Sequence, residues 1–328
     1  MSHAVPRFHD LTVSRIHPEA AGSVAVSLRI PPELRDTFAF EPGQFLTVRA
    51  SIDGQDVRRS YSISSPRSLY TAQGELTLGI RPVEGGLFSN WAATQLQAGD
   101  TLQVMPPDGR FTVHKPRAIH RVGFAAGSGI TPILSMIRSF GELPPAPWKL
   151  IYLTRFPETA AFREELGAPE LKSRVRIHHS HGDPARAFDL WPVLEKPNTA
   201  HVYCCGPLPM LEAYERATAG LPPERVHREY FAAKEAAATG GGFTVELARS
   251  RKTLEVPEGK SILDCLIEIQ VEPPFSCREG VCGTCEVRVL EGTPDHRDLV
   301  LTDAERAVGD RMMVCCSGAK SPRLVLDL

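Results

Sequence analysis

Short stretches in which apolar and polar residues alternate run through the first 115 residues, and this pattern predicts β-strands. Turn signals such as Pro42-Gly43 and Asp53-Gly54 separate them. The predicted strands cover residues 11–13, 24–28, 45–50, 59–63 and 75–80. Many short strands at this spacing are typical of an antiparallel barrel or sandwich, so we predict an all-β domain over residues 1–115.

The pattern changes near residue 120, where apolar strands begin to alternate with helical segments. Residues 121–126 predict a strand that runs into Gly127-Ser128-Gly129, followed by a helix from Pro132 to about Phe140. Further strands are predicted at 149–153, 175–178 and 201–205, with helices at 160–166 and 209–219. Alternating strands and helices indicate a doubly wound α/β domain with a parallel sheet, over residues 116–231.

A third segment follows residues 232–241, whose sequence AAKEAAATGG predicts a linker that is partly helical and then flexible. Beyond it, residues 243–247 and 252–256 predict a β-hairpin, and a helix is expected from Ser261. We therefore expect a separate α+β domain over residues 242–328.

Composition narrows the function classes. The chain has 328 residues, with 42% hydrophobic and 23% charged residues and a net charge of −2. These values are those of a globular protein and argue against a nucleic-acid binder, which would be basic. No apolar run approaches the roughly 20 residues that span a bilayer, and the polar start MSHAVPRFHD lacks an export signal. We expect a cytoplasmic protein without membrane segments.

The cysteines indicate metal chemistry. A disulfide scaffold is the alternative for eight cysteines, but this chain is long, and four of the cysteines in its last part have a ligand-like spacing. Cys277, Cys282 and Cys285 form a C-x4-C-x2-C loop, and Cys315 follows after 29 intervening residues. This spacing is that of a plant-type [2Fe–2S] cluster. Zinc is the main rival, but zinc motifs usually contain paired C-x2-C units, and only one is present.

Two short motifs stand out in the first domain. Arg59-Ser60-Tyr61-Ser62 lies on a predicted strand, and alone it would be a weak signal. Gly85-Gly86-Leu87-Phe88-Ser89 opens a helix after the strand at 76–81. Glycines that lead into a helix N-terminus offer free N–H groups and a positive dipole end to a pyrophosphate.

Two further motifs in the second domain follow predicted strands in the same way. Gly127-Ser128-Gly129-Ile130-Thr131-Pro132 opens a helix, although it is not the G-x-G-x-x-G of a Rossmann dehydrogenase. Tyr203-Cys204-Cys205-Gly206-Pro207 ends a strand before another helix. A buried strand residue is the commoner fate of a lone cysteine, but the two motifs together favour a pyridine-nucleotide site.

With these motifs the chain resembles the ferredoxin–NADP reductase superfamily over essentially its whole length. The order of flavin barrel, nucleotide domain and ferredoxin domain is similar to the phthalate dioxygenase reductase type, and also to the reductase component of phenylacetyl-CoA epoxidases. The resemblance implies a flavin β-barrel at 1–115, an NAD(P)-binding domain at 116–231, and a β-grasp-like [2Fe–2S] ferredoxin domain at 242–328.

The resemblance also implies roles for individual residues. The flavin would be held by three groups of residues: Arg59, Tyr61 and Ser62; Gly79, Ile80 and Arg81; Gly86, Leu87, Phe88 and Ser89. The pyridine nucleotide would contact Gly127, Gly129, Thr131, Pro132, Thr154, Arg155, Cys205, Gly206 and Pro207. Hydride transfer would depend on Ser62 near flavin N5, on Thr131 and Cys205 around nicotinamide C4, and on Phe231 as a shield of the ring. For Phe231, plain packing at a domain seam is an equal alternative.

The closing motif Met312-Met313-Val314-Cys315-Cys316 resembles that of ferredoxins, with Cys315 as the fourth ligand. Neighbouring residues of a strand point to opposite faces, so Cys316 would face its own core. Cys265, within the predicted helix, is most simply a small buried side chain.

The resemblance further implies which cofactors bind. The FMN-dependent reductase for which this type is named lacks the spaced G-G-x-x-S form that FAD members have. This chain has the form, so FAD is expected rather than FMN. For the nucleotide, Arg155 could meet a 2′-phosphate, but the Thr154-Arg155 pair also occurs in members that use NADH. NADH is expected rather than NADPH.

The implied function is electron transfer from NADH through FAD and the [2Fe–2S] cluster to a separate oxygenase, expected to be of the Rieske type. The partner would dock near Arg278, Glu279 and Thr284. The reductase of a di-iron epoxidase or of a P450, or a redox sensor that binds flavin without turnover, remains an alternative.

Overall fold

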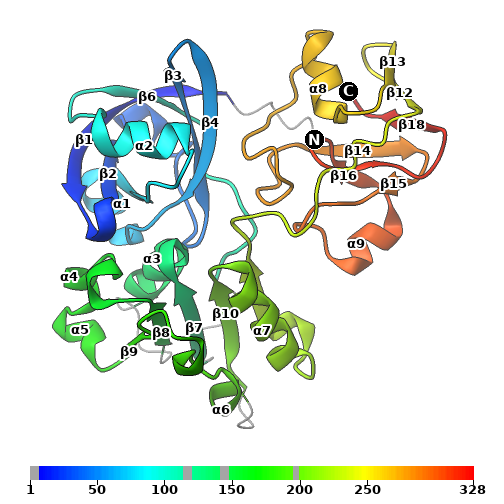
Figure 1. Cartoon of the computed structure of the whole chain (residues 1–328). Helices are drawn as coiled ribbons and strands as arrows, with labels where there is room; N and C mark the ends of the chain where they lie inside the picture. The colour runs from blue at the N-terminus through cyan, green and yellow to red at the C-terminus, as the bar shows by residue number, and fades with distance from the viewer. Residues whose placement is uncertain (1–6, 114–119, 141–147, 195–198) are drawn as a thin grey trace. The chain divides into compact units, whose positions relative to one another are not determined.

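The structure is a computed structural model that describes residues 7–113, 120–140, 148–194 and 199–328. These residues form two compact units, which divide between Phe231 and Ala232. In Figure 1 the first unit runs from blue to yellow-green and the second from yellow to red. Each unit is described by itself below. The expected boundary at 115/116 lies outside the described residues.

Antiparallel strands form the first sheet of the N-terminal unit, in the spatial order β4-β3-β6-β1-β2-β5. They are β1 (His9–Pro18), β2 (Val24–Arg29), β3 (Phe45–Ile52), β4 (Gln55–Ser62), β5 (Glu75–Ile80) and β6 (Thr101–Val104). A bridge between Ile63 and Leu78 joins the two edges, and there the N–H of Ser64 also donates to the carbonyl of Thr77. The sheet therefore curls into the expected barrel.

Two short helices, α1 (Arg67–Gln73) and α2 (Leu87–Thr94), accompany the barrel strands. Inward-facing residues such as Leu11, Val26 and Val48 are completely shielded from solvent. Phe88 of α2 joins this core. Because alternate positions of each strand point inward, the period-two pattern of the sequence produces a continuous apolar interior.

The second sheet is parallel, in the order β11-β10-β7-β8-β9. Its strands are β7 (Arg121–Ala126), β8 (Trp148–Thr154), β9 (Val175–His179), β10 (His201–Cys205) and β11 (Val226–Glu229). The helices are α3 (Ile130–Phe140), α4 (Arg163–Leu166), α5 (Pro169–Lys172), α6 (Trp191–Leu194) and α7 (Leu208–Thr218). The chain enters at β7, proceeds to β8 and β9, and then crosses to β10. The reversal lies between β7 and β10, the place where open α/β sheets bind ligands.

The C-terminal unit contains a mixed sheet in the order β13-β12-β18-β14-β16 and a small ribbon of β15 and β17. The strands are β12 (Phe243–Leu247), β13 (Lys252–Val256), β14 (Glu286–Glu291), β15 (Pro294–Asp295), β16 (Arg311–Met313), β17 (Gly318–Ala319) and β18 (Arg323–Leu326). Helices α8 (Ile262–Glu268) and α9 (Asp303–Val308) complete it. Ser261 caps α8 in a reciprocal capping box with Asp264, which explains why the helix begins there.

Two sequence-based expectations about local structure were wrong. The helix expected over 160–166 begins only at Arg163, because Phe162 adopts a left-handed backbone conformation with φ 58°. Residues 232–241 contain no helix. The N–H of Ala238 donates to the carbonyl of Cys316, and the carbonyl of Thr239 accepts from Gly259. This segment is therefore bonded to the C-terminal unit.

No helix among the described residues is both long enough and apolar enough to cross a membrane.

Candidate functional site

Strand β4 presents the first of the expected flavin residues. The side chain of Arg59 is exposed, whereas Ser62 at the strand end is buried. The hydroxyl of Ser62 has no hydrogen bond to another described residue. The ring of Tyr61 lies 5.7 Å from that of Phe88, centroid to centroid, and burial raises the pKa of Tyr61. The end of β4 thus offers a neutral phenol and an available hydroxyl.

Strand β5 contains the expected flavin residues Gly79 and Ile80, and Arg81 follows it; this strand offers the site more backbone than side-chain surface. The side chain of Ile80 is buried in the barrel core, and Arg81 extends into solvent beyond the strand. A Cβ on Gly79 would lie 2.6 Å from Cγ2 of Thr131 and 2.8 Å from Cζ of Phe162. Any side chain at this position would displace Thr131 or Phe162, because the barrel strand and the α/β domain meet there in close contact.

The start of α2 fits the pyrophosphate of a dinucleotide. Gly86 is the N-cap, no side chain caps this end, and the first turn contains no acidic residue. The N–H groups of the first turn, at Leu87, Phe88 and Ser89, have no partner within the helix. A Cβ on Gly86 would lie 2.5 Å from both Oγ of Ser89 and Cγ2 of Val83. The loop therefore has little space for a side chain at Gly86, and the backbone N–H groups at the start of α2 are available to an anion.

The loop after β7 and the end of β10 meet at the sheet reversal. Gly127 has φ 55°, the left-handed region that favours glycine. A Cβ on Gly129 would lie 2.1 Å from the carbonyl oxygen of Cys205, and one on Gly206 would lie 3.1 Å from Cβ of Ala126. The two motifs that the sequence suggested are therefore in direct contact, with Pro207 as the N-cap of α7.

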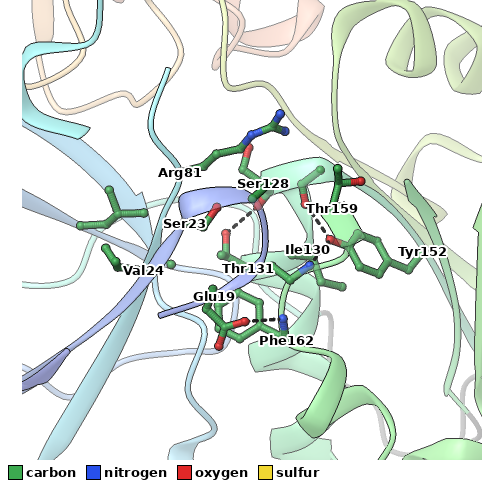
Figure 2. Close-up of a pocket in the computed structure, with 15 residues that line it drawn as sticks. Glu19, Ser23, Val24, Arg81, Ser128, Ile130, Thr131, Tyr152, Thr159 and Phe162 are labelled. Carbon is green, nitrogen blue, oxygen red and sulfur yellow. Dashed lines mark hydrogen bonds between the residues drawn. The ribbon is translucent and has the colours of Figure 1, made fainter. Parts of the chain in front are cut away.

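Helix α3 begins beside this contact. Its second and third residues are Thr131 and Pro132, and the Thr131 hydroxyl donates to the carbonyl of Ser128 over 2.9 Å. Pro132 is buried in the first turn, where its missing N–H breaks no helical bond. Figure 2 shows Thr131 and Ser128 in a pocket together with Arg81 from the flavin strand side. Of the residues expected to hold the flavin, Gly79, Ile80 and Arg81 line this pocket, and Gly127 and Thr131 of the expected nucleotide residues line it with them.

The end of β10 brings Cys205 against Glu229, a contact that the sequence did not predict. Sγ of Cys205 lies 4.0 Å from Oε2 of Glu229. Burial raises the pKa of Cys205, and the Glu229 carboxyl raises it further. Burial also raises the pKa of Glu229 to about 8, although part of this side chain reaches the surface. In the sequence, the only sign of a role for Glu229 is its position two residues before Phe231. In the structure Phe231 is 39% exposed.

Thr154 and Arg155 lie at the end of β8, farther along the sheet. The Thr154 hydroxyl is within 2.6 Å of Nδ1 of His179 and 3.2 Å of the carbonyl oxygen of Phe156. It is buried, whereas Arg155 is exposed. The hydroxyl is therefore engaged inside the domain, and the guanidinium is available at the surface.

In the C-terminal unit the four expected ligands come together. The thiol of Cys277 interacts with those of Cys282 and Cys315, and the thiol of Cys315 interacts with that of Cys285. The described residues contain no group of three or more His, Cys, Asp or Glu side chains arranged for a single metal ion. Four cysteine thiolates are the ligand set of a two-iron cluster, in which each iron would take two of them.

The loop between these cysteines is shaped for a cluster. Gly280 has φ 72°, and a Cβ there would lie 2.5 Å from Sγ of Cys316. The N–H of Glu279 donates to Sγ of Cys277 over 3.3 Å, which stabilises a thiolate. The Thr284 hydroxyl lies against Cys282 and has no other polar partner among the described residues. These donors suit sulfur ligands that carry negative charge.

The neighbouring Cys316 points elsewhere. Its Sγ lies 3.8 Å from the carbonyl oxygen of Met313 and 3.8 Å from Oγ of Ser317. It packs against Gly280, at the back of the loop between Cys277 and Cys282. Cys265 is buried in α8, within the core of the unit.

Comparisons with known proteins agree with this architecture. Residues 20–113 match the family described as oxidoreductase FAD-binding domain, and residues 245–320 match the 2Fe-2S iron-sulfur cluster binding domain. The phenoxybenzoate dioxygenase subunit beta of Ectopseudomonas oleovorans is 43% identical over 321 residues, which cover 96% of each chain. Phthalate dioxygenase reductase of Burkholderia cepacia is 42% identical over 294 residues, covering 88% of each.

The fold comparison gives the same relationship. A solved structure of phthalate dioxygenase reductase, described as modular for electron transfer from pyridine nucleotides to [2Fe-2S], matches with a TM-score of 0.70. The match has 37% sequence identity and covers 98% of both chains. The chain therefore belongs to the phthalate dioxygenase reductase family of oxygenase reductases.

Proposed function

We propose that the protein takes a hydride from NADH onto FAD and passes electrons singly through a [2Fe–2S] cluster to a separate oxygenase. The observation that carries this proposal is the contact at Gly79, where strand β5 meets helix α3. A Cβ added to Gly79 would lie 2.6 Å from Cγ2 of Thr131. Hydride transfer needs reacting atoms about 3–3.5 Å apart, so the two sites must share one pocket. The cofactors supply the redox chemistry, and the protein positions them.

The residues proposed to act at the flavin end are Arg59, Tyr61 and Ser62 on β4, with Gly79 and Arg81 at β5. The N–H groups from Gly86 to Ser89 would hold the second phosphate that distinguishes FAD from FMN. Release of the bound flavin by heat and measurement of its mass tests this assignment, because FAD and FMN differ by an AMP group. Recovery of FMN alone would contradict it.

For the nucleotide we propose NADH rather than NADPH. A 2′-phosphate needs cationic or hydroxyl groups around it, and the Thr154 hydroxyl is already bonded to His179 and to the backbone of Phe156. Arg155 remains as a candidate cation. A kcat/KM for NADPH that equals or exceeds the value for NADH would overturn this preference.

The proposed acceptor is a Rieske-type oxygenase in a separate chain, in keeping with the dioxygenase names of both curated relatives. Its docking surface would surround the cluster loop at Arg278, Glu279 and Thr284. Cys277 and Cys282 are partly exposed, whereas Cys285 and Cys315 are buried, so a cluster held by these four cysteines would be nearest to solvent on the side of this loop. Redox encounters of this kind bury small areas and are transient.

NADH-driven reduction of cytochrome c by the fully loaded protein tests the whole relay. We expect turnover with the native chain. Cys282→Ser, which removes a proposed cluster ligand, should still let NADH bleach the flavin but should abolish most of the cytochrome c reduction. A loaded protein that binds flavin and cluster without turning over NADH would instead be the redox sensor considered above.

A further inference from the structure

A set of hydrogen bonds connects the barrel to the loop after β7. Oε2 of Glu19 accepts from the N–H of Phe162 over 2.8 Å. The preceding N–H, of Ala161, donates to the hydroxyl of Tyr152 over 3.3 Å, and that hydroxyl donates to the carbonyl of Gly127 over 3.4 Å. Figure 2 shows Glu19, Phe162 and Tyr152 around the pocket that Arg81 and Thr131 also line. The successive N–H groups of Ala161 and Phe162 therefore bond to two different domains, the first to Tyr152 of the α/β domain and the second to Glu19 of the barrel.

The backbone at Phe162 is unusual for a bulky side chain. Its φ of 58° and ψ of 33° lie in the left-handed region, which costs an L-residue other than glycine roughly 1–2 kcal/mol. The residue is only 4% exposed. Burial of the ring in the core of the α/β domain and the bond to Glu19 of the barrel offset the strain.

The ring of Phe162 and the methyl of Thr131 meet over the same backbone atom. Cζ of Phe162 lies 2.8 Å, and Cγ2 of Thr131 2.6 Å, from the point where Gly79 would carry a Cβ. The segment held by Glu19 therefore touches flavin strand β5 at Gly79, beside Thr131 of α3. Any shift of this segment changes the separation between that strand and α3.

The charge state of Tyr152 suits a permanent hydrogen bond. Burial raises its pKa to about 12, so the hydroxyl stays protonated and can both donate and accept at working pH. The Glu19 carboxyl is half-buried and its pKa is raised by burial, while the Phe162 N–H lowers it. A glutamate carboxyl offers a carbonyl-type oxygen to that N–H in either charge state.

We propose that Glu19 and Tyr152 are positioning residues for hydride transfer, which together hold the Ala161–Phe162 segment and the Gly127 loop at a fixed distance from flavin strand β5. The inference rests on the proposed NADH-to-flavin function. Neither residue was among those expected to bind a cofactor. They act through backbone groups of the loop and the segment rather than on the reacting atoms.

Tyr152→Phe removes one hydroxyl and leaves the ring in place. We expect the limiting rate of flavin reduction by NADH to fall about tenfold, because misplacement by 1 Å costs up to about 100-fold. The Kd for NADH should change less than the rate. Tyr70→Phe is the matched control, since its hydroxyl bonds the carbonyl of Arg35 within the barrel, and it should keep the native rate.

A second pair of variants separates the bond from the charge at Glu19. Glu19→Gln retains an oxygen that accepts from Phe162 and should retain most of the native rate, whereas Glu19→Ala should lower it as Tyr152→Phe does. Amide hydrogen exchange provides a readout independent of activity: it should accelerate at Phe162 in Glu19→Ala and at Ala161 in Tyr152→Phe.

The outcomes are distinguishable. Native rates per bound flavin in both Tyr152→Phe and Glu19→Ala would overturn the proposal, as would equal losses in Glu19→Gln and Glu19→Ala. A variant that loses only bound flavin or thermal stability would assign the residue a purely structural role and overturn it too. If the wild type itself does not oxidise NADH, the proposed function fails, while the exchange data still report whether the hydrogen bonds hold the segment.

Discussion

The thiol of Cys205 and the carboxyl of Glu229 face each other across two parallel strands, with Sγ 4.0 Å from Oε2. The two residues are partners in the register of β10 and β11, so their side chains leave the sheet on the same side. Burial raises the pKa of both groups, that of Glu229 to about 8. At neutral pH the pair is therefore protonated and uncharged.

This pair predicts a specific pH dependence of stability. The ordinary pKa of the Glu229 carboxyl is 4.5 and its folded value is about 8. Between these values the unfolded chain releases the proton while the folded protein retains it, so the free energy of unfolding falls as pH rises from about 4.5 to 8. Its contribution is fully present below pH 4.5 and is lost as pH passes through 8.

Glu229→Gln removes the titration while it keeps the shape of the side chain. We expect the variant to lose less thermal stability than the wild type between pH 6 and pH 9. Thermal unfolding of both proteins across this range provides the measurement. Parallel pH profiles for the two proteins would show that Glu229 titrates near its ordinary value in the folded state.

The two adjacent cysteines provide a sharp test of the cluster ligands. Cys315 interacts with Cys277 and Cys285, whereas Cys316 packs against Met313 and Ser317. We expect Cys315→Ser to lose most of its iron and visible absorbance, and Cys316→Ser to retain both with at most a small loss of stability. Iron content per chain after anaerobic reconstitution measures this. Cluster loss in Cys316→Ser alone would reverse the assignment.

The close contact at Gly129 predicts a steric effect. An added methyl would lie 2.1 Å from the carbonyl oxygen of Cys205, where two backbones meet. Overpacking of this kind costs about 1–3 kcal/mol, so Gly129→Ala should lower the free energy of unfolding by about that much and weaken NADH binding. Gly220→Ala is the matched control, because an added Cβ there has no neighbour within 4 Å. Equal stability of the two variants in urea would contradict the geometry.

Residues with a fixed chemical task could be predicted from sequence. The C-x4-C-x2-C loop requires glycine and cysteine at set spacings, and Gly127, Gly129 and Cys205 follow strands whose ends meet at the sheet reversal. Each motif requires a particular backbone conformation and binds a particular type of ligand, so both can be predicted from the order of residues alone. The expected fold class and the FAD-binding and [2Fe–2S] domains are confirmed by the family matches.

Contacts between distant segments could not be predicted in this way. Glu19 and Phe162 are 143 residues apart, and nothing in the local sequence marks Phe162 for a left-handed conformation, which its burial and its bond to Glu19 stabilise. That conformation also explains why the helix expected at 160 begins at Arg163. The contact between Glu229 and Cys205 likewise depends on the parallel register of β10 and β11. Tertiary context decided each of these positions.

The exposed carboxylate of Glu279 tests the proposed docking surface. It stands in the cluster loop between the partly exposed Cys277 and Cys282, and it forms no ion pair with another described residue. Charges at the rim of an interface are arranged to complement the partner and act mainly on the association rate. We therefore expect Glu279→Lys to lower the second-order rate of electron transfer to the oxygenase several-fold at low salt, with a smaller effect at high salt.

The design separates docking from the internal relay. Glu255→Lys makes the same charge change at an exposed position of edge strand β13 in the same unit, and it should transfer electrons at the native rate. Flavin reduction by NADH should be unchanged in both variants, because neither residue lies in the N-terminal unit. If Glu279→Lys and Glu255→Lys slow the reaction equally, net charge controls the encounter and the cluster loop is not the docking surface. A loss confined to Glu279→Lys, and abolished by salt, would assign the exit of electrons to this loop.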